Sequence, residues 1–235
     1  MRVAVIRFPG TNCDLDTIRA INSVPGAVCD LVWHSDDVNL SKYDLVVLPG
    51  GFSYSDRLRA GAIAARLPVM EGVRDFAEDG GLVLGICNGF QVLVESGMLP
   101  GALLPNSNGR FVCRWVHLKV EENRGPFTNL FDRNEVIALP VAHREGRYHP
   151  QEPTAGDGSG YRVVMRYVDR SGRRTAAANP NGSYGSIAAI SNREGNVLGM
   201  MPHPERACDP LLSPLGRCDG LRLFLSAANY VRGSA

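Results

Sequence analysis

Residues 82–93 read Leu82-Val83-Leu84-Gly85-Ile86-Cys87-Asn88-Gly89-Phe90-Gln91-Val92-Leu93. The apolar run 82–86 is typical of a strand that is buried on both faces, as in a parallel sheet. The residues from Phe90 onward favour a helix. Gly85 and Gly89 each lie two positions from Cys87, and the crowded backbone of a sharp strand-to-helix turn requires small residues there. The stretch therefore predicts a turn that presents the Cys87 side chain at the end of a sheet.

A cysteine in such a turn is a candidate nucleophile. The helix that follows points its N-terminus at the sulfur, and its dipole favours a thiolate over a thiol. The backbone N–H of Asn88, the next residue, is placed to stabilise an oxyanion. The alternative is that Cys87 is an inert cysteine buried at the end of a core strand. The two glycines at the required spacing favour the nucleophile.

The composition is that of an ordinary globular protein, with 44% hydrophobic and 21% charged residues in a chain of 235. A formal net charge of +1 gives no indication of a nucleic-acid or membrane partner. No two of the six cysteines have the Cys-x-x-Cys spacing of a zinc or redox motif, and neither Lys42 nor Lys119 lies in a Walker A loop. No apolar run approaches the roughly 18 residues of a membrane span, and the first is too short for a signal peptide. We expect a reducing cytoplasm and no metal site.

The first hundred residues alternate between predicted strands and helices. Further strands are expected over 3–6, 27–33 and 45–48, and helices over 14–24, 61–66 and 69–78, the first capped by Asn12 or Asp14. This alternation predicts an α/β fold in which a central, mostly parallel sheet carries helices on both faces. Ligands bind such sheets beyond the carboxyl ends of the strands, where Cys87 and the Gly50-Gly51 pair both fall.

The second half is richer in predicted strands. They are expected over 111–120, 136–141, 161–168, 186–190 and 197–201, before a closing helix within 215–231. The Pro- and Gly-rich segment 151–160 is the site where disorder is expected. We expect residues 1–235 to form a single domain.

A cysteine nucleophile needs a base, and His203 is the leading candidate. It lies in Met201-Pro202-His203-Pro204-Glu205-Arg206, after a predicted strand, and Glu205 is close enough in sequence to orient its imidazole. Taken alone, this motif could equally be a surface His-Glu pair. His143 is the rival base, with its own alternative as a hydrogen-bonding loop histidine, whereas His34, His117 and His149 have no supporting context.

Six motifs together resemble the class I, triad-type glutamine amidotransferases. The motifs are Phe8-Pro9-Gly10-Thr11-Asn12-Cys13-Asp14, Leu48-Pro49-Gly50-Gly51-Phe52-Ser53-Tyr54, Gly85-Ile86-Cys87-Asn88-Gly89-Phe90-Gln91, Ala142-His143-Arg144-Glu145-Gly146-Arg147-Tyr148, Asn179-Pro180-Asn181-Gly182-Ser183 and Gly199-Met200-Met201-Pro202-His203-Pro204-Glu205-Arg206. Within that family they are similar to the branch of glutaminase subunits of phosphoribosylformylglycinamidine synthase, almost from end to end. The chain departs from the branch at Ser55 and Arg57, where glycine and tyrosine are usual, and in the 151–160 loop.

The resemblance implies a flavodoxin-like α/β fold, a function and a set of site residues. Glutamine would be hydrolysed by a triad of Cys87, His203 and Glu205. The further roles it implies are an oxyanion hole from Gly51 and Asn88 and substrate binding by Gly50, Gln91, His143 and Gly146. The ammonia would pass to a large synthetase subunit that uses ATP and Mg to convert formylglycinamide ribonucleotide to formylglycinamidine ribonucleotide in de novo purine biosynthesis. A small bridging subunit is implied too, and no cofactor in this chain.

Three rival interpretations remain open at this point. The chain could serve a synthetase for GMP, imidazole glycerol phosphate or anthranilate, although segments 8–14 and 143–148 argue against this. It could be a cysteine hydrolase or stress protein with an elbow cysteine, which would not need His203 and Glu205. It could also be a catalytically silent binding subunit, which the intact Cys87, His203 and Glu205 make a weaker interpretation.

Overall fold

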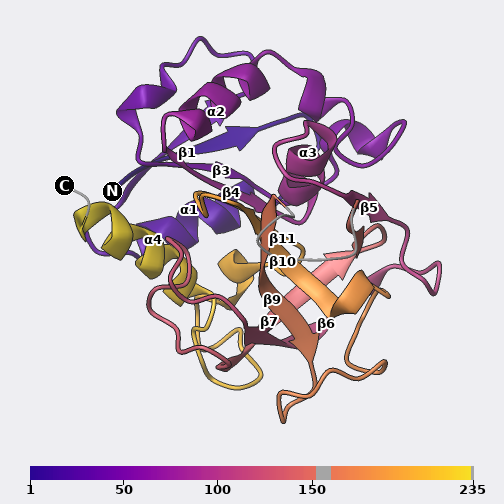
Figure 1. The fold of residues 1–235 in the computed structure, drawn as a ribbon. Coiled ribbons are helices and arrows are strands. Elements are labelled where there is room, and N and C mark those ends of the chain that lie inside the picture. The colour runs from indigo at the N-terminus through magenta and orange to yellow at the C-terminus, as the bar shows by residue number, and fades with distance from the viewer. Residues whose placement is uncertain (152–159, 234–235) are drawn as a thin grey trace.

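A nine-stranded sheet runs through the computed structural model, which describes residues 1–151 and 160–233 (Figure 1). The strand order is β2-β1-β3-β4-β11-β10-β9-β6-β7. The strands are β1 (Arg2–Arg7), β2 (Val28–Trp33), β3 (Leu45–Leu48), β4 (Leu82–Ile86), β6 (Val112–Val120), β7 (Val136–His143), β9 (Tyr161–Val168), β10 (Ile187–Asn192) and β11 (Val197–Met200). A second, two-stranded sheet pairs β5 (Ala102–Leu104) with β8 (Arg147–His149).

The sheet is parallel in its first half and antiparallel in its second. β2, β1, β3, β4 and β11 form the parallel half, which confirms the α/β fold expected from the apolar runs. From β11 onward each pair is antiparallel, through β10, β9, β6 and β7. Met200 pairs with Ile86 in neighbouring parallel strands. The segments that follow β4 and β11 therefore leave the same edge of the sheet side by side.

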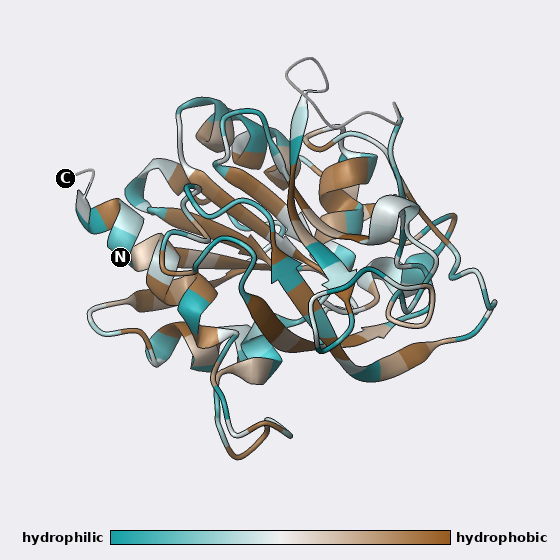
Figure 2. Cartoon of the chain, turned by 60° about the horizontal axis from the view of Figure 1, so that its bottom comes forward, coloured by the Kyte–Doolittle hydropathy of each residue, from teal (hydrophilic) through white to brown (hydrophobic). Residues whose placement is uncertain are grey.

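Among the described residues, four α-helices cover the parallel half on its two faces. They are α1 (Asp14–Asn22), α2 (Val69–Glu78), α3 (Asn88–Glu95) and α4 (Leu221–Gly233). Figure 1 shows α2 and α3 above the parallel strands and α1 and α4 below them. The apolar runs form the hydrophobic centre between these layers (Figure 2). Within residues 1–151 and 160–233, no helix combines the length and the hydropathy needed to cross a lipid bilayer.

Several predicted boundaries and one predicted helix were wrong. Residues 61–66 form only a 3₁₀ turn, Ala64–Arg66. Gly61 has a φ of +80°, and a Cβ there would lie 2.7 Å from the Val92 nitrogen of α3, so the segment enters its turn in a conformation that an α-helix excludes. The N-cap of α1 is Cys13 and not Asn12 or Asp14, because the Cys13 carbonyl oxygen accepts the first intrahelical bond, from the Thr17 N–H at 3.0 Å. The short strands β5 and β8 were not predicted, and residues 152–159 lie outside the described residues.

Candidate active site

Cys87 occupies the predicted turn between β4 and α3. Its backbone has φ 50° and ψ −103°, a strained combination for a residue with a side chain. A Cβ on Gly85 would lie 2.7 Å from the Gly89 oxygen, and a Cβ on Gly89 would collide with the backbone oxygen of Leu48. The need for glycine two residues to either side of Cys87 is therefore a direct steric consequence of this turn.

A cavity of about 390 Å³ opens beside Cys87, within the size range of small-molecule sites. Its lining residues come from loops, the end of β7 and the start of α3: Gly51, Phe52, Ser55, Asp56, Cys87, Gln91, Phe111, Ala142, His143, Arg144 and Glu145. The Cys87 thiol lies 3.7 Å from the Ala142 carbonyl oxygen, to which it can donate. A small polar molecule in this cavity would meet the sulfur directly.

His203 and Glu205 form a buried pair just beyond the end of β11. The backbone N–H of His203 donates to the Pro140 oxygen of β7 at 2.8 Å, and its Nδ1 lies 2.6 Å from Glu205 Oε1. Burial alone lowers the pKa of His203, but Glu205, Cys87 and Cys13 together raise it well above its ordinary value. Nε2 is buried and has no conventional hydrogen-bond partner among the described residues. With Nδ1 held by the carboxylate, Nε2 is the nitrogen that remains to exchange a proton with Cys87.

His143, the rival base, has both ring nitrogens next to amide side chains. Its Nδ1 lies 3.1 Å from Asn106 Oδ1, and its Nε2 lies 3.4 Å from Asn181 Nδ2. Burial, together with the charge of nearby His203, lowers the pKa of His143 to about 4. A neutral histidine held in this way is a poor acceptor for a thiol proton. His143 is therefore a wall of the cavity, and His203 is the better base.

Of the glycines expected at the site, Gly51 lines the cavity, whereas Gly50 and Gly146 do not. Gly51 lines the cavity with a φ of +149°, and a Cβ there would lie 2.8 Å from the Asn12 nitrogen. Gly50 and Gly146 lie behind the cavity wall. A Cβ on Gly50 would lie 2.8 Å from His203 Cε1, and one on Gly146 would collide with the ring of His143. These two glycines make room for the histidine rings and do not line the cavity.

Known proteins resemble this chain along almost its whole length. The family described as CobB/CobQ-like glutamine amidotransferase domain matches residues 1–231. The phosphoribosylformylglycinamidine synthase subunit PurQ of Pyrococcus furiosus is 52% identical over 232 residues, 99% of each chain. The subunit of the same name from Moorella thermoacetica is 52% identical over 231 residues, 98% of this chain and 96% of its own. This chain belongs to the PurQ family.

Solved structures agree with this assignment. A chain in the structure of PurLQS from Thermotoga maritima is 44% identical, has a TM-score of 0.85 and is covered to 98%, as is this chain. A putative GMP synthase component from Thermoplasma acidophilum is only 15% identical, with a TM-score of 0.61 and coverage of 100% of this chain and 97% of its own. The second likeness concerns the fold alone, that of the class I glutamine amidotransferases.

In this PurQ-family chain, hydrogen bonds of the Asn88 and Gln91 side chains connect the loops around the cavity. Asn88 Oδ1 accepts from the Ser53 N–H at 3.1 Å, and Asn88 Nδ2 donates to Gln91 Oε1 at 2.9 Å. Gln91 Nε2 in turn donates to the Glu145 oxygen at 2.7 Å. The first turn of α3 is thus bonded to both loops that form the mouth of the cavity. The N–H groups at a helix start lack intrahelical partners, and that of Asn88 is one of them.

Sequence reasoning missed the buried thiol of Cys13. Cys13, His203 and Glu205 offer ligand-type atoms that all lie within 4.8 Å of one another. Two thiols therefore adjoin the same imidazole. Cys87 lines the cavity and Cys13 does not, so Cys87 is the sulfur that a bound substrate would meet. The motif 8–14 contains Cys13, but nothing in the sequence indicated its long-range neighbours.

The loop after Gly51 was predicted only as polar. Four of its residues have left-handed backbones: Tyr54, Ser55, Asp56 and Leu58. Asp56 lines the cavity, and burial together with the charge of Glu145 raises its pKa to about 6. Two carboxylates therefore face the cavity at its mouth. The departure from the family at Ser55 falls on a residue with φ +57°, a conformation that glycine adopts readily.

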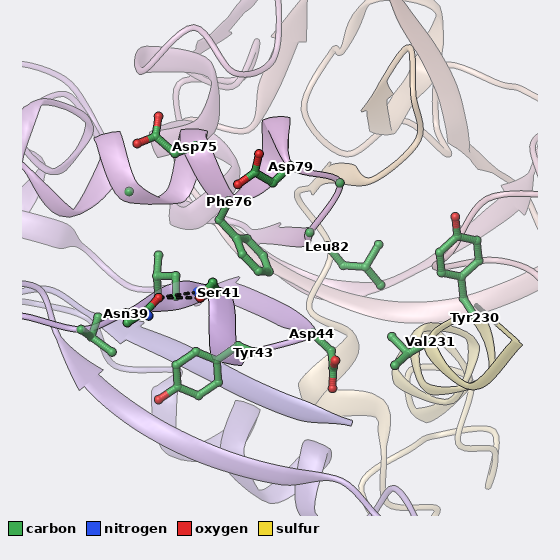
Figure 3. Close-up of a pocket in the computed structure, with 15 residues that line it drawn as sticks. Asn39, Ser41, Tyr43, Asp44, Asp75, Phe76, Asp79, Leu82, Tyr230 and Val231 are labelled. Carbon is green, nitrogen blue, oxygen red and sulfur yellow. Dashed lines mark hydrogen bonds between the residues drawn. The ribbon is translucent and has the colours of Figure 1, made fainter. Parts of the chain in front are cut away.

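A larger cavity, of about 650 Å³, lies at the other end of the strands (Figure 3). Asp44 and Leu82, at the amino ends of β3 and β4, line it with Phe76 of α2 and Val231 of α4. Figure 3 shows the carboxylates of Asp44, Asp75 and Asp79 around this space. No histidine or thiol lines it. It is therefore unsuited to the chemistry that Cys87 and His203 can perform.

Proposed function

We propose that this chain hydrolyses glutamine to glutamate and ammonia and acts as the glutaminase subunit of a phosphoribosylformylglycinamidine synthase. The observation that carries the proposal is that Cys87 lines the cavity from a strained turn, while the buried His203–Glu205 pair adjoins it. Membership of the PurQ family supports the choice of synthase. The similarity to a chain of PurLQS from Thermotoga maritima supports assembly with PurL and PurS subunits.

The reaction begins with transfer of the Cys87 proton to Nε2 of His203. The thiolate attacks the carbon of the glutamine side-chain amide, and a C–S bond forms as the carbonyl oxygen becomes an oxyanion. The N–H groups of Gly51 and Asn88 stabilise that charge. The imidazolium then gives its proton to the amide nitrogen, the C–N bond breaks, and ammonia leaves a γ-glutamyl thioester on Cys87.

Water completes the cycle at the same sulfur. His203 takes a proton from water as the oxygen attacks the thioester carbon. The C–S bond breaks, glutamate departs, and the proton returns to the Cys87 sulfur. Glu205 keeps Nδ1 of His203 protonated throughout, so that Nε2 remains the nitrogen that exchanges protons.

The mouth of the cavity suits the charged end of an amino acid. Asp56 and Glu145 would receive the α-ammonium group, while Arg144 and the amide of Gln91 lie beside the same space for the α-carboxylate. We assign His143 to the cavity wall, and we keep Gly50 and Gly146 as residues that shape substrate binding through the two histidine rings. The site uses no cofactor of its own in this proposal.

Ammonia is useful to a synthase only if it reaches a second active site before it is protonated in water. The proposal therefore includes a synthetase subunit that binds ATP and Mg and a small bridging subunit. It also includes a cytoplasmic location, where glutamine and nucleotides are available. We expect little glutaminase activity from this chain alone.

The test measures glutamate and ammonia release by this chain alone and then with its candidate synthetase and small subunit, formylglycinamide ribonucleotide, ATP and Mg. Cys87→Ala should abolish glutamine-dependent product formation and leave synthesis from added ammonium salt intact. Cys113→Ser, at an exposed cysteine on β6, is the matched control and should behave as the unaltered chain. Release that depends on Cys87 but ignores this synthetase would overturn the choice of synthase. No release in any mixture would overturn the glutaminase itself.

A further inference from the structure

Cys13 is a buried thiol whose position is fixed by the backbone around it. Its N–H is bonded to the Gly50 oxygen at 3.1 Å, and its own carbonyl oxygen accepts from the Thr17 N–H at 3.0 Å and the Thr17 hydroxyl at 2.7 Å. The first contact holds Cys13 against the end of β3, and the others hold it at the first turn of α1. The Cys13 backbone therefore cannot move without disturbing two elements of the fold.

The sulfur lies between the catalytic histidine and an arginine. It accepts a hydrogen bond from Arg206 Nη2 at 3.0 Å and can donate to Asn12 Oδ1 at 3.2 Å. A Cβ added to Gly50 would lie 3.1 Å from the Cys13 sulfur and 2.8 Å from His203 Cε1. The Cys13 sulfur and the edge of the His203 imidazole therefore both lie next to Gly50, which has no side chain to separate them.

Arg206, which donates to the Cys13 sulfur, also lies close to Glu205, the hydrogen-bond partner of His203. Its Nε lies 3.9 Å from Glu205 Oε1 and 3.8 Å from Asp16 Oδ2. Cys13 and Arg206 thus lie close to the His203–Glu205 pair, and neither of them lines the cavity. The neighbouring Cys13 thiol is among the groups that raise the pKa of His203.

Two other roles fit these contacts poorly. A second nucleophile would have to meet substrate, and Cys13 does not line the cavity. A metal ion held by Cys13, His203 and Glu205 would lie close to the Arg206 guanidinium, whose positive charge is 3.0 Å from the sulfur. Within that set, Nδ1 of His203 is already bonded to Glu205 Oε1 at 2.6 Å.

We propose that Cys13 is a positioning residue of the glutaminase. Its sulfur bears on the edge of the His203 ring and anchors Arg206 beside Glu205, so the imidazole is held in the orientation that presents Nε2 to Cys87. The inference rests on the proposed function, because it assigns Cys13 a part in that same reaction. Small misplacements of a catalytic group are costly, about a hundredfold for about 1 Å.

The test uses Cys13→Ala and Cys13→Ser in the assembled complex with the synthetase and the small subunit. Cys13→Ala is expected to lower kcat for glutamine hydrolysis about ten- to a hundredfold, to change KM for glutamine by less than about twofold, and to shift the limb of the pH profile that His203 controls. Cys13→Ser should recover part of kcat, because a hydroxyl oxygen still accepts from Arg206. Cys113→Ser is the matched control, and synthesis from ammonium salt should be unchanged in all variants.

The outcomes separate this inference from the function on which it rests. If the unaltered complex fails to release glutamate, the proposed function fails. If it is active and Cys13→Ala keeps its kcat and pH profile, Cys13 merely fills space. If both Cys13 variants also lose synthesis from ammonium salt, its role is in folding or assembly. Either of the last two results overturns the positioning role and leaves the glutaminase standing.

Discussion

His203 has one strong hydrogen-bond partner, Glu205, at Nδ1, whereas Nε2 has no conventional partner among the described residues. Glu205 lies 2.6 Å from Nδ1, and the pKa of His203 is raised by this carboxylate and by the neighbouring thiols despite burial, which acts the other way. Because the folded pKa exceeds that of the unfolded chain, protonation of His203 stabilises the fold. That contribution is fully present below a pH of about 6.5 and is lost as pH rises through the folded pKa. In the proposed reaction the same pairing would keep the imidazole oriented toward Cys87.

Glu205→Gln should therefore damage catalysis more than assembly. The amide keeps the shape of the side chain but removes the charge that holds Nδ1 protonated, and we expect kcat for glutamine hydrolysis to fall by about two to four orders of magnitude. Steady-state glutamate release by the assembled complex is the measurement. Glu194→Gln, at an exposed glutamate, is the matched control. A Glu205→Gln complex within twofold of the unaltered rate would show that Glu205 does not orient the base.

Asp56 gives the site a second pH dependence. Its carboxyl has its pKa raised from 3.8 to about 6 by burial and by Glu145, so it gains its charge as pH rises from about 5 to 7. If the charged form receives the α-ammonium of glutamine, kcat/KM rises over that range. Asp56→Asn should remove this part of the profile and raise KM at pH 7.5 about tenfold, with kcat little changed.

The control for Asp56 is an acid outside the cavity. Asp36→Asn, at an exposed residue after β2, should leave kcat/KM and its pH dependence unchanged. A profile for Asp56→Asn that matches the unaltered complex would remove Asp56 from glutamine binding.

At the scale of elements, the turn between β4 and α3 depends on what packs around it. Gly85 and Gly89 leave room for Leu93 and for the backbone of Leu48, and α3 then presents Asn88 and Gln91 to the cavity loops. One of those loops, over residues 52–58, contains several residues other than glycine whose backbones are left-handed. A residue with a Cβ is strained there, by about 1–3 kcal/mol.

Ser55→Gly should consequently stabilise the protein. Ser55 is exposed and has φ +57°, so glycine relieves strain and loses no buried contact. The net gain, after the greater freedom of glycine in the unfolded chain, is about 1 kcal/mol, or about 2–4 °C in Tm. Calorimetry of the isolated chain measures it. Ser23→Gly, at φ −80°, is the control and should lower Tm. A lower Tm for Ser55→Gly would mean that the loop is not strained.

The sequence predicted the elements whose stability is local in origin. The continuous apolar runs predicted β1, β3 and β4 to within a residue or so, and the Gly-x-Cys-x-Gly spacing predicted the turn at Cys87. The strands β5 and β8 are three residues each and form only because they pair with one another. Their pattern is too short to be distinguished from a loop.

The same limit applies to the site. Cys87, His203 and Glu205 each lie in a compact motif, and the sequence alone was enough to name them as candidates. The contacts of Asn106 and Asn181 with His143, and of Cys13 with Arg206, join residues far apart in sequence. They arise only once the sheet has brought segments 8–13, 140–146 and 201–206 to one edge. No local pattern contains that information.

For the whole molecule, the sheet order explains why one end carries the chemistry. The carboxyl ends of β4 and β11 are adjacent, and β7 brings its own end to them through the bond from His203 to Pro140. The cavity opens at this end, and exposed apolar side chains surround its mouth. Phe52 and Phe111 line the cavity and are 44% and 49% exposed, while Leu58, in the same loop as Phe52, is 89% exposed. Apolar side chains at the mouth of a site whose product must avoid water indicate a surface that a partner covers.

Phe111→Ser and Leu58→Ser should therefore weaken assembly with the synthetase. Truncation of a well-packed apolar residue at an interface typically costs about 1–2 kcal/mol, which raises Kd about five- to thirtyfold. Titration of labelled chain with synthetase and small subunit measures Kd. Val28→Ser is the control, because Val28 is 58% exposed but begins β2 at the amino end of the strands, away from the cavity. At saturating synthetase the two variants should regain most glutamine-dependent activity, since neither side chain takes part in the chemistry. Equal losses of affinity at Val28 and at the mouth would mean that the partner does not cover the cavity. Ammonia would then have to leave the protein by a route away from the mouth.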